Sequence, residues 1–136
     1  MELALLDTDT LSEVLRHRNA NVAGNSARYL TEYGEFAFSA VTHYEIVRGL
    51  LLKEADRKLS QFSKFAERAI IMPISTEVLL RAAELWVAGR RDGKPHRDAD
   101  LVIASTALIH QRRLITGNTM HFDWIPGLTL ANWREP

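Results

Sequence analysis

The stretch "LALLDTDTLS" (Leu3–Ser12) joins an apolar run to two carboxylates. Leu3 to Leu6 are apolar without interruption, as expected of a strand that is buried on both faces. Asp7 and Asp9 follow at once, although a carboxylate is costly to bury unless a partner compensates its charge. The stretch therefore predicts a core strand that ends in acidic side chains, and it raises the question of what those acids do.

The rest of the chain alternates between strand patterns and helix patterns. Further strands are expected at Phe36–Val41, Ala69–Ile74, Leu114–Gly117 and Leu128–Trp133. Helices are expected at Thr10–His17, Val22–Tyr33, Val41–Lys53, Asp56–Arg68, after a capping Ser75, and at Asp98–Arg113. Strands separated by helices predict an α/β domain, residues 1–136, with a small parallel sheet flanked by helices on both faces.

Composition narrows the class of protein. Because 46% of the 136 residues are hydrophobic, the chain should fold, and because it has no Cys it can form neither disulfides nor thiolate metal sites. Seventeen basic and seventeen acidic residues cancel, so nucleic-acid binding would need a local patch. No apolar run approaches the roughly 20 residues of a membrane span, and no signal-peptide pattern opens the chain. A cytoplasmic location is expected.

In open parallel sheets, ligands bind at the carboxyl ends of the strands. The first strand places Asp7 at that edge. The alternative interpretation is that Asp7, Thr8 or Asp9 only caps the following helix, for which all three residue types are suited.

Glu45 lies about one turn into the helix after the second strand. Gly49 is its i+4 neighbour, and a Gly within a helix suggests close backbone packing there, beside which a Glu would point inward. The alternative is a solvated Glu45 that pairs with Arg48 at i+3.

Asp100 heads a helical stripe of small and apolar residues, Ile103, Ala104 and Ala107, which should face the sheet. A carboxylate on such a stripe favours a bound cation or a helix N-terminus as compensation. Asp98 can face the same site only if it lies at or before the helix cap, and the alternative is that it is the N-cap itself.

Thr116 and Asn118 follow the fourth strand, although Gly-Asn also suits a plain turn. Carboxylates gathered at one edge without Cys favour a hard cation, Mg²⁺ or Mn²⁺, which can activate water and neutralise phosphate charge. The five His residues show no H-E-x-x-H spacing, so zinc is disfavoured.

The stretches "LLDTDTLS", "SAVTHYEIVRGL", "DADLVIASTA" and "LITGNTMHF" resemble the four motif regions of PIN-domain ribonucleases. The closest resemblance is to the VapC toxins of type II toxin–antitoxin modules, and it covers nearly the whole chain. It implies a PIN-like three-layer fold and a Mg²⁺-dependent endoribonuclease in which Asp7 and Asp100 bind the metal and Glu45 is the third acid. It also implies a homodimer, a VapB-type antitoxin and a structured RNA target, often a tRNA.

Two positions of this chain depart from the family pattern that it resembles. Asp9 stands where the family often has Asn, and Asn118 stands where it often has an acid, which puts a second metal in doubt. Thr8, Asp98, Thr116 and Asn118 are expected to support the site from its rim.

The loop "GRRDGKPHR" (Gly89–Arg97) precedes the Asp100 helix and gathers basic side chains. It is expected to hold an RNA backbone through Arg90, Arg91, Lys94 and Arg97, and the alternative is a solvated loop. His96 lies within the same loop.

Two other functions compete with the ribonuclease. One is a PIN-like module that binds RNA or a protein without cleaving, which the presence of Asp7, Glu45 and Asp100 disfavours. The other is a receiver-type domain, which needs an acceptor Asp at the end of a central strand, whereas the third strand ends in "MPIS".

Overall fold

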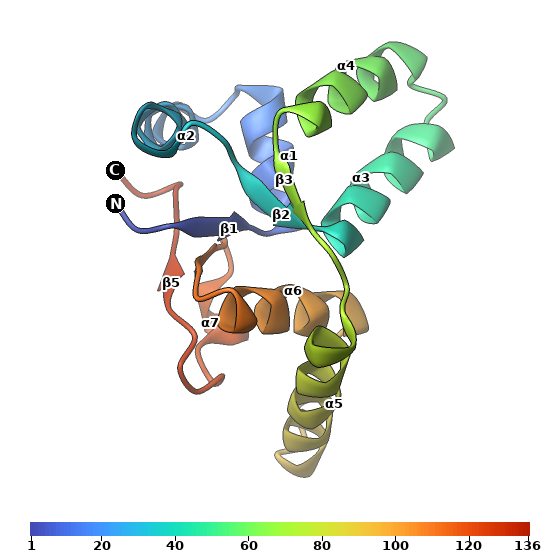
Figure 1. The fold of residues 1–136 in the computed structure, drawn as a ribbon, viewed down its shortest axis with the longest axis vertical. Coiled ribbons are helices and arrows are strands. Elements are labelled where there is room, and N and C mark those ends of the chain that lie inside the picture. The colour runs from blue at the N-terminus through green and yellow to red at the C-terminus, as the bar shows by residue number, and fades with distance from the viewer.

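A parallel sheet of five strands runs through the computed structural model, which describes residues 1–136 (Figure 1). The strands pair in the order β3-β2-β1-β4-β5. They are β1 (Ala4–Leu6), β2 (Ala37–Ser39), β3 (Ile70–Met72), β4 (Arg113–Ile115) and β5 (Leu130–Ala131). All four pairings are parallel, which confirms the predicted sheet.

Helices cover both faces of this sheet. Four lie on one face, in the upper half of Figure 1: α1 (Thr8–Arg16), α2 (Ala20–Tyr33), α3 (Ala40–Leu52) and α4 (Asp56–Glu67). Three lie on the other: α5 (Thr76–Arg91), α6 (Asp98–Ile109) and α7 (Thr119–Phe122). None of the helices has both the length and the apolar character needed to cross a lipid bilayer.

Alternate residues of the central strands serve two separate cores. Leu6 and Ile115 pack with the helices of the α1–α4 layer, whereas Leu5 and Leu114 pack with those of the α5–α7 layer. All four side chains are almost completely buried. Because successive strand residues point to opposite faces and both faces are covered, the opening strand is an unbroken apolar run in the sequence.

The strands are shorter than the sequence predicts, and a helix cap ends β2 early. The segment predicted as strand Phe36–Val41 stops at Ser39, whose hydroxyl accepts a hydrogen bond from the Val41 N–H at 3.1 Å and starts α3. Ser75 caps α5 as predicted, accepting from the Val78 N–H at 3.1 Å.

Two expectations are wrong. Asp98 is not the N-cap of α6, because Arg97 holds that position and Asp98 is the first helical residue. Gly49 does not allow a close backbone contact, because a Cβ atom there would meet nothing within 4 Å. The short helix α7 (Thr119–Phe122) was not expected at all.

The chain changes direction at β1. From β1 it runs outward to β2 and β3, and it then returns to the other side of β1 to form β4 and β5. The carboxyl ends of β1 and β4 therefore stand next to each other at the switch point of the sheet, where open α/β folds bind their ligands. Asp7 follows β1 there, and Thr116 follows β4.

Candidate functional site

Asp7 is buried at this switch point. Its backbone N–H donates to the Ile115 carbonyl at 3.0 Å, which extends the β1–β4 ladder by one step. Its Oδ1 accepts from the Thr10 N–H at 2.7 Å, so Asp7 is the N-cap of α1 and the capping interpretation is correct for it. Only 7% of the residue is exposed, which is far more burial than a helix cap needs.

Burial raises the pKa of Asp7, since it disfavours the charged form more than the nearby donors favour it. Those donors are the Thr116 hydroxyl and the backbone and side chain of Thr10, and the charge of Asp9 acts against them. Thr116 itself is fully buried, and its Oγ1 also accepts from the Asn118 N–H at 3.0 Å. Thr116 thus ties the turn after β4 to the carboxylate after β1.

Glu45 turns inward from α3 toward the start of α1. The Thr8 hydroxyl donates to Glu45 Oε1 at 2.7 Å and lies 3.1 Å from the Thr42 hydroxyl. Arg48 Nη2 lies 3.5 Å from Glu45 Oε2, so the predicted i+3 pair forms as well. The Glu45 side chain is only 9% exposed, and the contact with Thr8, rather than any close packing at Gly49, gives the inward direction.

Asp100 faces the same edge from the first turn of α6. Ile103, Ala104 and Ala107 are buried against the sheet as predicted. The Asp100 carboxylate has two basic partners. Arg97 places Nε 3.2 Å from Oδ2 and Nη2 3.2 Å from Oδ1, and His121 Nε2 lies 3.1 Å from Oδ2.

Arg97 links the acids electrostatically. The hydrogen bonds and charge of Asp100 raise the pKa of Arg97, with smaller favourable contributions from the charges of Glu45 and Asp9. Its side chain is 69% exposed, so the guanidinium lies at the mouth of the acidic site. The basic loop therefore reaches the acids through its last residue.

His121 is the site residue that the sequence did not reveal. A search for ligand spacing within one helix could not find it, because it lies 21 residues from Asp100 on the unexpected helix α7. The ring of His96 packs edge-on against that of His121, with 4.9 Å between centroids, and stacks on Trp124 at 4.6 Å. Burial, followed by the charge of His121, lowers the pKa of His96.

The other residues predicted to support the site lie further out. Asp98 is exposed and forms no hydrogen bond or ion pair; it borders an apolar groove between α5 and α6 that includes Trp86 and Leu101. Asn118 is exposed at the start of α7, and its side chain makes no capping hydrogen bond. Neither side chain forms a hydrogen bond or ion pair with Asp7, Glu45 or Asp100.

The remaining basic residues of the loop are open to solvent. Arg90, Arg91 and Lys94 are all exposed, and the Arg90 guanidinium lies over the Trp86 ring, 4.6 Å from its centroid. None of the three pairs with an acid, so their charges are available to a ligand.

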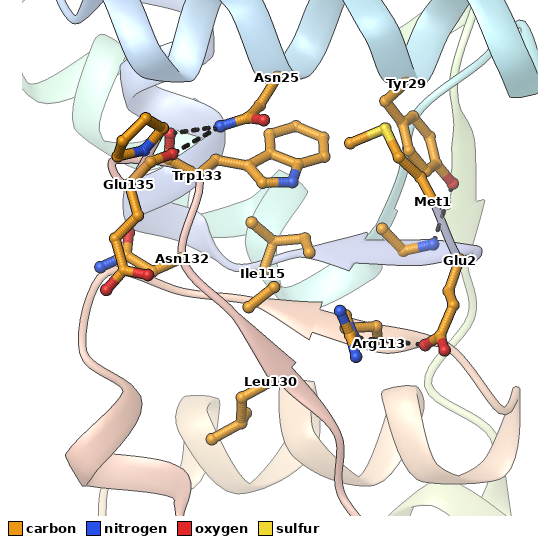
Figure 2. A pocket seen from close by; sticks show the side chains of 13 residues that line it. Met1, Glu2, Asn25, Tyr29, Arg113, Ile115, Leu130, Asn132, Trp133 and Glu135 are labelled. Carbon is orange, nitrogen blue, oxygen red and sulfur yellow. Dashed lines mark hydrogen bonds and ion pairs between the residues drawn. The ribbon is translucent and has the colours of Figure 1, made fainter.

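A second hollow, between α2 and the β5 edge, contains none of the predicted site residues (Figure 2). Glu2 and Arg113 form an ion pair of 3.3 Å along it, and the Asn25 side chain donates to the carbonyls of Trp133 and Glu135. These contacts join the two ends of the chain to the core, which gives this hollow a structural explanation.

The donor set at the acidic edge suits a hard divalent cation. Asp7, Glu45 and Asp100 offer carboxylate oxygens that are nearly withdrawn from water, and a cation would compensate their charge. As the side chains stand, no three acidic or histidine residues converge closely enough to hold one ion. Arg97 donates to both oxygens of Asp100, so its guanidinium would compete with a cation for this carboxylate.

Comparison with known proteins identifies the family of the chain. A family model described as PIN domain matches residues 4–126. Ribonuclease VapC1 of Methanocaldococcus jannaschii is 29% identical over 119 residues, which cover 88% of this chain and 78% of that protein. The tRNA(fMet)-specific endonuclease VapC of Shigella flexneri is 23% identical over 130 residues, covering 95% and 96% of the two chains.

Solved structures show the same fold. A chain of VapBC2 from Rickettsia felis, bound to a DNA fragment from its promoter, superposes with a TM-score of 0.84 at 25% identity, covering 96% of this chain and 98% of that one. A chain of DNA-bound VapBC from Salmonella typhimurium superposes with a TM-score of 0.85 at 22% identity, covering 98% and 99%.

Proposed function

This chain belongs to the PIN domain family, and from that premise we propose that it is a metal-dependent endoribonuclease, the toxin of a type II toxin–antitoxin module. The names of its VapC relatives support a nuclease that acts on RNA. The observation that carries the proposal is the placement of Asp7, Glu45 and Asp100, three nearly buried carboxylates, around the carboxyl edge of one parallel sheet.

Asp7 and Asp100 would hold the cation, Mg²⁺ or Mn²⁺, and Glu45 would help to hold it or orient the attacking water. When bound, the cation supplies the positive charge that activates water and neutralises the phosphate. The protein holds the carboxylates in position for this chemistry. Thr10 and Thr116 fix the Asp7 carboxylate, and Thr8 fixes that of Glu45.

The RNA backbone would lie along the loop before α6. Arg90, Arg91 and Lys94 offer unpaired charges there, and such charges bind phosphates without reading sequence. Arg97, displaced from Asp100 by the cation, would gain a phosphate as its new partner. A tRNA is the proposed substrate class, because the relatives from Shigella flexneri and Salmonella typhimurium are named tRNA(fMet)-specific endonucleases.

A VapB-type antitoxin is the proposed partner. Several superposable structures are VapBC complexes, two of them bound to DNA. An antitoxin would inhibit the enzyme by placing a basic side chain among the acids, where Arg97 already shows that a guanidinium fits. We also propose that the toxin is a homodimer.

RNA cleavage by the purified protein tests the activity. The protein should cut total cellular RNA with Mg²⁺ or Mn²⁺, and EDTA should abolish cutting. Asp100→Asn should lose most of the activity and keep its circular dichroism spectrum, whereas the exposed control Glu84→Gln should cut normally. Full activity of a folded Asp100→Asn protein would refute the assignment and favour the alternative, a PIN-like module that binds without cleaving.

Growth tests the toxin role. Expression of the chain alone should arrest a host culture, and Asp7→Asn should relieve the arrest at an equal protein level. Equal growth of cells that express the wild type and the variant would refute the proposed role as a toxin, even if the purified enzyme cuts RNA.

A further inference from the structure

The imidazole of His121 shares an oxygen of Asp100 with Arg97. His121 Nε2 and Arg97 Nε lie 3.1 Å and 3.2 Å from Asp100 Oδ2. The two basic groups differ in what they can do next. A guanidinium can only repel a metal ion, whereas an imidazole can bind one through Nε2 once that nitrogen gives up the proton that it now donates to the carboxylate.

The ring of His121 is held in this direction by its neighbours. The Phe122 ring packs edge-on against the His121 ring at 5.1 Å, while Trp124 Nε1 donates to the backbone carbonyl of His121 at 3.0 Å and so fixes the main chain there. His96 supports the ring from another side, at 4.9 Å. A ring fixed by such contacts loses little freedom when it binds a ligand.

His96 reaches that supporting position because residue 89 is a glycine. A Cβ atom on Gly89 would lie 3.0 Å from His96 Cδ2 and 2.9 Å from the Lys94 carbonyl oxygen. Any side chain there would push the loop, and with it His96, away from His121. A glycine within α5 is therefore needed for this group of rings to form.

The separation of His121 Nε2 and Asp100 Oδ2 is that of two ligands on one metal ion. Neighbouring ligands of an octahedral cation, each about 2.0–2.1 Å from the metal, lie roughly 3 Å apart. The 3.1 Å hydrogen bond in the structure is close to that separation, so an ion would replace the Nε2 proton and compete with Arg97 while His121 and Asp100 move little relative to each other. The His121 side chain is also 31% exposed, so an ion can reach it from solvent.

We infer that His121 is a nitrogen ligand of the divalent cation that Asp100 holds, and that it shifts the preference of the site from Mg²⁺ toward Mn²⁺. Oxygen ligands suit Mg²⁺, whereas imidazole favours the transition metals. The inference rests on the proposed function only for the presence of a cation, and its test needs no RNA.

Pulsed electron paramagnetic resonance of Mn²⁺ bound to the full chain, prepared with ¹⁵N-labelled histidine, reads the ligand directly. The wild type should show coupling between Mn²⁺ and one histidine nitrogen. His121→Ala should lose that coupling, while the exposed control His110→Ala should keep it. Thermal melts of all the variants verify that they fold.

Calorimetric titration with each ion measures the preference. His121→Asp keeps a ligand but exchanges nitrogen for oxygen. The ratio of the Mg²⁺ dissociation constant to the Mn²⁺ dissociation constant should therefore fall by about tenfold, which is the size of change seen when groups that support metal sites are altered. An unchanged ratio, Mn²⁺ bound without nitrogen coupling, or no saturable Mn²⁺ binding would overturn the inference. If nitrogen coupling is present but RNA is not cut, the inference stands and the proposed function fails.

Discussion

Arg97 binds Asp100 through both arms of its guanidinium, with each nitrogen 3.2 Å from a different carboxylate oxygen. The two lie three positions apart in the sequence, and Arg97 is the N-cap residue of the helix whose first turn carries Asp100. The chain thus carries its own cation at the position where the proposed function requires a metal ion. Under the proposed function, the metal ion would compete with this guanidinium for Asp100.

Arg97→Gln should strengthen cation binding. An exposed ion pair contributes roughly 0.2–1 kcal/mol, so loss of the competing charge should lower the half-saturating Mn²⁺ concentration by a factor of about 1.4 to 5. Calorimetry of the RNA-free protein measures this, with Arg91→Gln as the control because Arg91 is exposed and pairs with no acid. Weaker Mn²⁺ binding by Arg97→Gln would show that Arg97 supports the site instead of competing for it.

Asp7→Asn should stabilise the metal-free protein near neutral pH. Because burial raises the pKa of Asp7 above its ordinary value of 3.8, the folded state binds this proton more tightly than the unfolded state does. The free energy of unfolding therefore decreases as the pH rises from about 3.8 through the raised pKa of Asp7, and it stays low at pH values above that pKa. An Asn has no such charge and still caps α1.

Urea unfolding at several pH values measures the effect. The gain from Asp7→Asn should be largest at about pH 7 and should shrink as the pH falls toward 3.8. Glu84→Gln, in the exposed middle of α5, should show little change at any pH. A gain that is independent of pH would mean that packing, and not charge, is responsible.

Thr8→Val should slow RNA cleavage, since it removes the hydroxyl that holds Glu45 Oε1 at 2.7 Å. A hydrogen bond to a charged group contributes about 1.5–3 kcal/mol, so the loss in kcat should be roughly ten- to hundredfold if the bond acts fully in the transition state. Thr8→Ser keeps the hydroxyl and should keep most of the rate. Equal rates for the Ser and Val variants would show that Thr8 does not position Glu45.

Asn118→Asp should lower the Mg²⁺ concentration needed for half-maximal cleavage, because a carboxylate at the end of β4 adds negative charge beside the site. Asn118→Ala should reduce the rate less than Asp100→Asn does, since Asn118 is exposed and its side chain makes no capping bond. A Mg²⁺ titration of cleavage compares the three variants. If Asn118→Asp brings no change and Asn118→Ala cuts normally, Asn118 only shapes the turn.

The sequence was most informative where a periodic pattern of apolar residues determines which way a neighbouring acidic side chain faces. The apolar run before Asp7 and the stripe of Ile103 and Ala104 leave each acid a single edge to face, and both patterns are buried as predicted. The parallel sheet followed from the order of such segments. These parts of the site were predictable because burial of apolar surface decides them.

The other parts of the site depend on local geometry that produces no periodic pattern in the sequence. Helix α7 has 4 residues, too few for an apolar stripe, so the position of His121 could not be predicted. Glu45 was expected to turn inward beside Gly49, yet the contact that directs it comes from Thr8, 37 residues away. Asp98 was a plausible cap by residue type, but the backbone places the cap one residue earlier.

The acids come from both helical layers, which lie on opposite faces of the sheet and also touch where α3 meets α6. Asp7 and Glu45 belong to the layer of α1 and α3, whereas Asp100 and His121 belong to the layer of α6 and α7. The chain has no cysteine with which to join them covalently. An ion bound by both Asp7 and Asp100 would form a reversible cross-link between the two helical layers. Metal binding should therefore slow amide hydrogen exchange in both layers at once.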